Sequence, residues 1–78
     1  MGISILISKV IGMNAQDVTE NSSPTTVDGW TSIKMLMLIS AVETEYGIKL
    51  SLDEMKKLYD VKSFLDMLQQ RGIEDADL

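Results

Sequence analysis

The stretch SIKMLMLISAVETEYG, Ser32 to Gly47, decides the fold. Its apolar side chains recur at three- and four-residue spacings, which places them along one face of an α-helix. Gly47 stands where a left-handed residue closes a helix. We therefore predict a helix over Ser32–Tyr46. The residues expected to face the core are Met35, Leu38, Ile39, Val42 and Tyr46.

Segments near both ends of the chain carry weaker helical signals. Residues 3–12, ISILISKVIG, repeat apolar side chains at helical spacings, although their β-branched residues would also suit a strand. We predict a first helix there. Asp60 can cap a last helix, which Gly72 would stop.

A short helix is predicted between the central and last helices. Ser51 with Glu54 three residues later forms a capping-box pattern, so this helix should run from Leu52 to near Leu58. The sequence thus predicts an all-α fold, a small four-helix bundle with a long loop between helices 1 and 2 and a short third helix.

The loop, residues 14–31, reads NAQDVTENSSPTTVDGWT and is rich in turn-forming residues. Structureless loops longer than about 15 residues are uncommon in compact domains and are usually functional or disordered. We expect three apolar residues to anchor this loop to the core: Val18, Val27 and Trp30.

Composition excludes several classes of protein. The 78 residues form one small domain, whose acidic end, about residues 72–78, we expect to be frayed. The absence of Cys and His argues against a metal site and a catalytic role, so we predict no enzyme. A net charge of −5 disfavours nucleic-acid binding, and no apolar run is long enough to cross a membrane. We expect a cytoplasmic monomer without a signal peptide.

Ser32 is the candidate functional residue. A helix N-terminus has unpaired N–H groups and a positive dipole end, which favour an attached phosphate by typically about 0.3–1 kcal/mol. The commoner reason for a serine at this position is simple N-capping.

An apolar flank of the same helix is the candidate partner surface. Ile33, Leu36 and Met37 lie away from the core stripe, bordered by Lys34 and Glu43. These side chains either pack beneath the long loop or form a face that binds a partner. The sequence leaves both interpretations open.

The order of these features resembles the acyl carrier protein family over nearly the whole chain. GWTSIKMLMLISAVETEYGIKLS looks like the family's Asp-Ser-Leu motif with its acidic, aromatic, Gly-Ile ending. VKSFLDML looks like the closing helix, and DVTENSSPTTVDGW is similar to the loop of members that place Trp just before the motif. The order and spacing of the pieces carry the resemblance.

The resemblance implies a phosphoprotein in which a phosphopantetheinyl transferase attaches phosphopantetheine to Ser32. The terminal thiol of that cofactor would carry an acyl group as a thioester and present it to acyl-loading and acyl-using enzymes of fatty acid or polyketide biosynthesis. Trp30 would then hold the loop still next to Ser32, or would only fill the end of the core; both roles predict its burial. Candidate cargo-contacting residues, which could equally be plain core, are Met35, Ile39, Met55, Phe64 and Met67.

The chain departs from the family pattern around the serine. Thr31 replaces the usual Asp, which puts the efficiency of modification in doubt, and Lys34 and Met37 replace residues that are commonly acidic in fatty-acid carriers. We therefore expect a specialised pathway rather than central fatty-acid synthesis. The alternatives are an aminoacyl or peptidyl carrier, or a non-carrier helical adaptor that binds a partner through Ile33, Leu36 and Met37 and uses Ser32 only as a cap.

Overall fold

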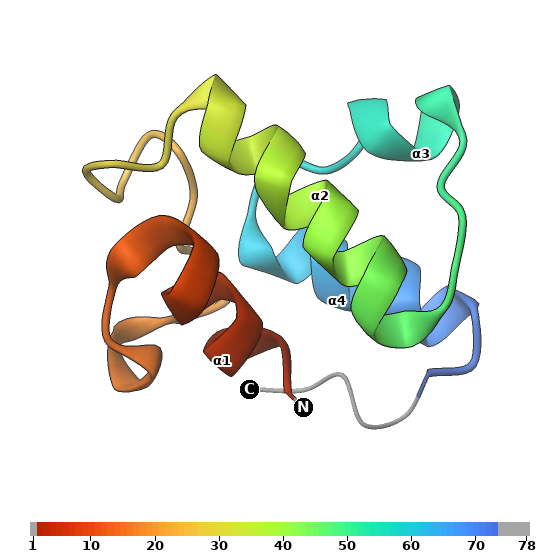
Figure 1. The fold of residues 1–78 in the computed structure, drawn as a ribbon, viewed down its shortest axis with the longest axis horizontal. Helices are drawn as coiled ribbons and strands as arrows, with labels where there is room; N and C mark the ends of the chain where they lie inside the picture. Colours follow the sequence, from red (N-terminus) through yellow and green to blue (C-terminus); the bar gives the residue numbers. More distant parts are fainter. Residues whose placement is uncertain (1, 74–78) are drawn as a thin grey trace.

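The computed structural model describes residues 2–73, which fold into helices joined by loops. Figure 1 shows α2 running diagonally across the front of α4, with α1 on one side and the short α3 on the other. The predicted four-helix, all-α architecture is confirmed. Most of the predicted acidic tail, residues 74–78, lies outside the described residues. The elements are α1 Ile3–Ile7, the π-helical turn η1 Ser8–Gly12, the 3-10 turn η2 Ala15–Asp17, α2 Ser32–Tyr46, α3 Leu52–Lys56 and α4 Val61–Gln70.

The ends of α2 are set by local hydrogen bonds. Thr31 is the N-cap, and its hydroxyl accepts a hydrogen bond from the backbone N–H of Lys34 at 3.2 Å. At the other end Gly47 has a left-handed φ of 64°, and the N–H groups of Gly47 and Ile48 both donate to the carbonyl of Glu43. This arrangement satisfies a carbonyl that the helix itself leaves free. The predicted bounds of the helix are confirmed.

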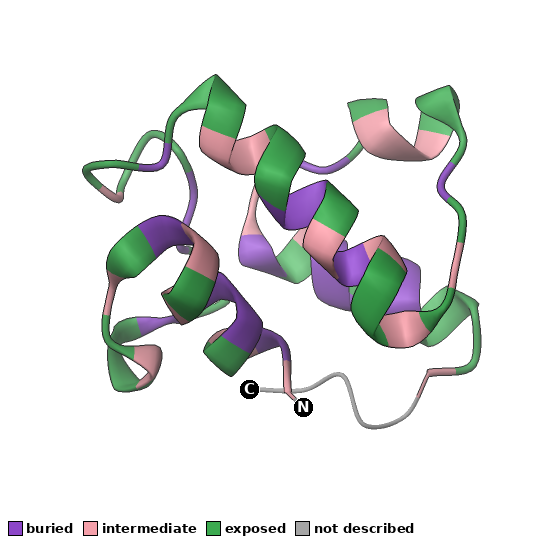
Figure 2. Cartoon of the chain, in the orientation of Figure 1, coloured by how far each residue is buried: buried purple, intermediate pink, exposed green. Residues whose placement is uncertain are grey.

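The hydrophobic core lies between α1, α2 and α4, whose buried faces turn toward one another (Figure 2). Within the predicted stripe of α2, Leu38, Ile39 and Val42 are buried, while Met35 and Tyr46 are half-buried and pack against the core. Full burial of such a side chain stabilises the fold by about 1.5–3 kcal/mol relative to exposure. The fully buried side chains are Phe64, Ile3, Ile7, Leu38, Leu68, Val42 and Val61.

The predicted first helix is present, but its second half is a π-helical turn that ends at Gly12. Ile3, Ile7 and Ile11 are all buried. The backbone is helical from Ile3 to Gly12, so the strand alternative for this segment is wrong, and the four-residue spacing puts these side chains on one helical face.

The long loop is ordered by contacts with α4. The carbonyl of Ser22 accepts from the N–H of Val61, and that of Glu20 accepts from the N–H of Lys62, both at 3.0 Å. These donors belong to the first turn of α4, where a helix provides no internal acceptors. The loop therefore completes the N-terminus of α4. Its predicted apolar anchors all pack into the core or against it: Val18, Val27 and Trp30.

Reciprocal caps begin both carboxyl-terminal helices. In α3 the Ser51 hydroxyl accepts from the N–H of Glu54, and the Glu54 carboxylate accepts from the N–H of Ser51. Asp60 and Ser63 do the same for α4. Both predicted helix starts are confirmed.

The predicted end of α3 near Leu58 is wrong, because the helix ends at Lys56. The N–H of Lys57 donates to the carbonyl of Glu54, and that of Leu58 donates to Met55, both over three residues. This tighter turn rotates Leu58 into the core, where it is buried.

Candidate functional site

Ser32 is the first residue of α2 and not its cap. Thr31 provides the cap, and its carbonyl also accepts the N–H of Met35 at 2.9 Å. Ser32 is exposed, and within residues 2–73 no group is hydrogen-bonded to its hydroxyl. The interpretation of Ser32 as a capping residue is therefore wrong, and the adaptor alternative loses its explanation for this serine. The hydroxyl stands free at the positive end of the helix dipole.

Trp30 holds the chain just before the site. Its side chain is only 3% exposed, as both of its expected roles require. Its backbone N–H donates to the carbonyl of Val27 at 3.3 Å. The indole Nε1 is buried, and no group in the described part of the chain accepts its hydrogen. Packing alone therefore fixes the indole. Between Val27 and Trp30 the loop turns through Gly29, whose φ of 87° is left-handed.

The exposed flank of α2 is apolar. Ile33 is 71% exposed, Leu36 65% and Met37 49%, so the expectation that they pack beneath the loop is wrong. Leu52, the first residue of α3, is 74% exposed and adds a fourth apolar side chain that was not singled out from the sequence. The sequence feature that could have identified Leu52 is its place directly after the capping residue Ser51, at the start of a helix.

Lys34 and Glu43, expected beside this flank, are both engaged within the chain. The Lys34 ammonium donates to the carbonyl of Val10 at 3.1 Å, at the end of the first helix, where a cation is favoured. The Glu43 carboxylate accepts from the N–H of Leu50 at 2.9 Å and fixes the link to α3. Both side chains are half-buried. The structure does not leave either charge free on the flank.

An apolar groove lies between α2 and α3 and reaches Ser32. Its volume is about 430 Å³. Three of the five expected cargo-contacting residues, Met35, Ile39 and Met55, line it. Phe64 does not, because it is fully buried in the core, and Met67 lines a different cavity between α3 and α4. The remaining lining residues are Pro24, Ser32, Leu36, Leu52 and Lys56.

Few features of the site suggest acid–base chemistry. The pKa of the Glu54 carboxyl lies below its ordinary range, because the backbone N–H of Ser51 donates to it and the Arg71 side chain both bonds and pairs with it. This carboxylate lies at the start of α3 and serves the fold. The described residues hold no cluster of three or more metal-binding side chains. None of their helices is long and apolar enough to traverse a bilayer.

Comparison with solved structures identifies the fold. No family model matches the sequence, and no curated protein matches it. The chain is similar to the solution NMR structure of the holo acyl carrier protein from Geobacter metallireducens, with a TM-score of 0.79 and 25% sequence identity. The match covers 97% of this chain and 91% of that one.

These findings define a small helical domain with the fold of an acyl carrier protein, in which a long loop leads into the central helix. The structural match supports the resemblance of the chain to the acyl carrier protein family. Similarity to a holo acyl carrier protein supports a carrier role for the chain and not an enzymatic one.

Proposed function

We propose that the chain is a discrete acyl carrier whose attachment residue is Ser32. The observation that carries this proposal is that Thr31, and not Ser32, caps α2. The Ser32 hydroxyl is therefore left exposed at the start of the helix. In the transfer, that oxygen loses its proton and bonds to the phosphorus of an activated phosphopantetheine donor, while the bond from that phosphorus to the donor's nucleotide phosphate breaks and the nucleotide leaves. The helix N-terminus then stabilises the phosphate without a basic pocket.

The site fits such a cofactor. When attached, phosphopantetheine supplies a terminal thiol that holds an acyl group as a thioester. Ser32 lies at the edge of the groove lined by Met35, Ile39 and Met55, so an apolar cargo has a place to lie beside its point of attachment. Flexible methionines suit guests of variable shape. Tethering also raises the effective concentration of the cargo at successive enzymes.

The surface around Ser32 indicates the kind of enzyme that uses this carrier. Exposed residues of α2 are Ser32, Ile33, Leu36, Met37, Ser40, Thr44 and Glu45, so the first three turns expose no charged residue. We assign Ile33, Leu36 and Met37 to partner binding and extend the surface to Leu52. An enzyme that reaches the arm on Ser32 should meet it with an apolar rim, which supports a specialised pathway over central fatty-acid synthesis. Lys34 and Glu43 would then contribute to partner binding only by fixing the position of α2. A cytoplasmic location and a monomeric state remain predictions.

The test is the intact mass of the protein after coexpression with a broad-specificity phosphopantetheinyl transferase. We expect one added phosphopantetheine on the wild type and none on Ser32→Ala. Ser40→Ala is the matched control, because Ser40 is also an exposed serine of α2, and it should be modified normally. A folded wild-type protein that remains unmodified would refute the proposal.

The same experiment addresses the adaptor alternative, which the exposed apolar flank favours. An unmodified Ser32 together with tight binding of a partner that is lost in Leu36→Ser would support an adaptor. An aminoacyl or peptidyl carrier would be modified as well. The thioester cargo of protein isolated from its native host, read by mass spectrometry, distinguishes that alternative from an acyl carrier.

A further inference from the structure

The short helix α3 lacks a buried face of its own. None of its five residues is buried. A buried leucine lies on each side of it in the chain, Leu50 before it and Leu58 after it. Of its residues only the half-buried Met55 packs against the core, so burial of apolar surface does little to set where α3 lies.

Arg71, directly after α4, makes the contacts that hold α3. Its Nη2 donates to both carboxylate oxygens of Glu54, at 2.6 and 2.7 Å, and its Nε donates to Glu54 Oε2 at 3.2 Å. The same Nη2 donates to the carbonyl of Lys49 at 2.8 Å. Glu54 Oε1 also accepts from the N–H of Ser51 at 3.0 Å. Arg71 therefore ties the end of α4 both to the first turn of α3 and to the link that precedes it.

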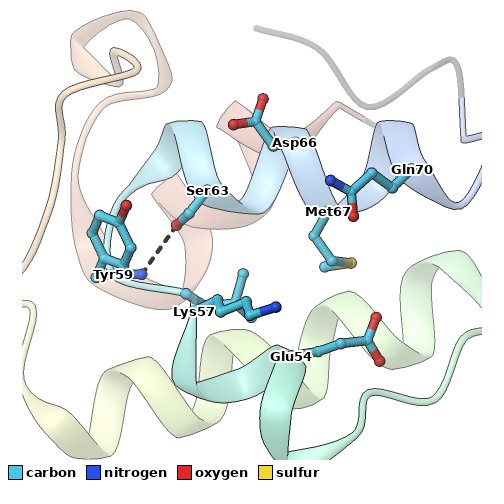
Figure 3. A pocket seen from close by; sticks show the side chains of 8 residues that line it. Glu54, Lys57, Tyr59, Ser63, Asp66, Met67 and Gln70 are labelled. Atoms are coloured by element: carbon cyan, nitrogen blue, oxygen red, sulfur yellow. Dashed lines mark hydrogen bonds between the residues drawn. The ribbon is translucent and has the colours of Figure 1, made fainter.

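Space is available on both sides of α3. The apolar groove toward α2 has a volume of about 430 Å³. On the opposite side, a cavity of about 290 Å³ lies between α3 and α4, with Glu54 and Lys57 on one wall and Met67 and Gln70 on the other (Figure 3). This space allows α3 to move relative to α2 and so to change the width of the groove, and of the residues of α3 only the half-buried Met55 packs against the core.

We propose that Arg71 is a positioning residue that fixes α3 and thereby sets the capacity of the groove beside Ser32. The bidentate pairing with Glu54 and the bond to Lys49 hold α3 in the position in which the groove is narrow. Loss of the pairing frees α3 to move away from α2, so that longer apolar cargo fits. The statement about cargo rests on the proposed function, whereas the statement about α3 does not.

The variants Arg71→Gln and Glu54→Gln test the pairing from both sides. Glutamine at position 54 keeps one oxygen for the capping box and removes the charge and one of the two acceptors for Arg71. Lys62→Gln is the control, since it removes an exposed cation from α4. If Arg71 and Glu54 act through each other, the double variant should show no more than either single variant.

Hydrogen exchange of the unmodified protein is the first measurement. We expect amides of residues 50–58 to exchange about two- to fivefold faster in Arg71→Gln and Glu54→Gln, as for loss of one partly exposed ion pair, with α2 unchanged. Lys62→Gln should match the wild type. Unchanged exchange in residues 50–58, or an equal increase in α2 and α4, would overturn the proposal.

The second measurement uses protein loaded at Ser32 with a series of saturated acyl thioesters of increasing length. The rate of thioester cleavage by hydroxylamine reports how well each chain is shielded. In Arg71→Gln the longest chains should become better shielded relative to the shortest, whereas a merely destabilised protein would lose shielding at all lengths equally. An unshifted length dependence would overturn the proposal. If Ser32 cannot be loaded, the proposed function fails, and the role of Arg71 is judged on exchange alone.

Discussion

Trp30 offers the sharpest test of how the loop serves Ser32. The indole is 3% exposed and two residues ahead of the serine. Trp30→Ala should cost about 3–5 kcal/mol, the usual range for removing a large buried aromatic side chain. A chain of this length has a total stability of roughly 4–12 kcal/mol at about 0.05–0.15 kcal/mol per residue, so part of the sample would unfold.

The variant Trp30→Phe changes the side chain at this site while the protein stays folded. Phenylalanine keeps a ring in the site and removes the indole N–H, whose unpaired burial costs about 1–3 kcal/mol. We therefore expect this variant to lose less than about 2 kcal/mol and to remain folded. Chemical denaturation followed by circular dichroism measures both variants.

The rate of Ser32 modification, corrected for the folded fraction, then decides the role of Trp30. Phe64→Ala is the control, because Phe64 is fully buried in α4 and its removal should cost a similar 3–5 kcal/mol. If Trp30 positions Ser32, Trp30→Ala should be modified about tenfold more slowly than Phe64→Ala, which corresponds to about 1.4 kcal/mol. Equal corrected rates for the two variants would refute positioning and leave Trp30 as core packing.

Three further perturbations follow from the helix ends. Thr31→Ala should destabilise the protein by about 1 kcal/mol through loss of the α2 cap, whereas Thr31→Asp should keep the cap and increase the modification rate; thermal melts and mass spectrometry check both. Gly47→Ala should cost about 1–2 kcal/mol in denaturant unfolding, because an added Cβ meets no neighbour and only the left-handed φ resists it. The lowered pKa of Glu54 means that the hydrogen bond from the Ser51 N–H, together with the pairing with Arg71, stabilises the fold above the ordinary pKa of glutamate, and that this stabilisation is lost as pH falls through the lower folded value. The stability difference between wild type and Glu54→Gln should therefore narrow from pH 7 to pH 3, and a constant difference would contradict a stabilising role of the Glu54 carboxylate.

The sequence was sufficient where structure is decided by near neighbours. The bounds of α2 follow from a hydroxyl residue before the first turn and a glycine after the last, and both capping boxes need only residues three apart. The apolar period of α2 placed Leu38, Ile39 and Val42 in the core correctly. These features depend on local backbone geometry, which a short segment specifies by itself.

The sequence was insufficient where two neighbours compete or distant residues meet. Thr31 and Ser32 can both cap a helix, and a shift of one residue decides which hydroxyl is free. The bonds from Lys34 to Val10 and from Arg71 to Glu54 join separate elements, so no spacing rule predicts them. For the same reason the methionines could not be divided in advance between the groove beside α2 and the cavity beside α4.

Position 31 shows how the capping role and the charge beside the serine can be separated. An aspartate there would both cap α2 and place a negative charge beside Ser32. Thr31 retains the hydrogen bond to the N–H of Lys34 and lacks the charge, so the helix start is preserved while the electrostatics change. The ammonium of Lys34 is bound to Val10, which leaves the exposed start of α2 without free charge.

Association with a partner enzyme through this surface should therefore depend little on salt. Long-range steering between oppositely charged surfaces falls steeply with ionic strength, because the Debye length shortens from about 10 Å at 0.1 M to about 3 Å at 1 M. An apolar face gains no such steering, and its binding relies on surface removed from water. The association rate constant with a cognate enzyme should change less than about threefold between 0.05 and 0.5 M NaCl. Met37→Glu should restore a salt dependence and weaken binding by the cost of desolvating a carboxylate. A strongly salt-dependent rate in the wild type would show that charges outside α2 dominate recognition.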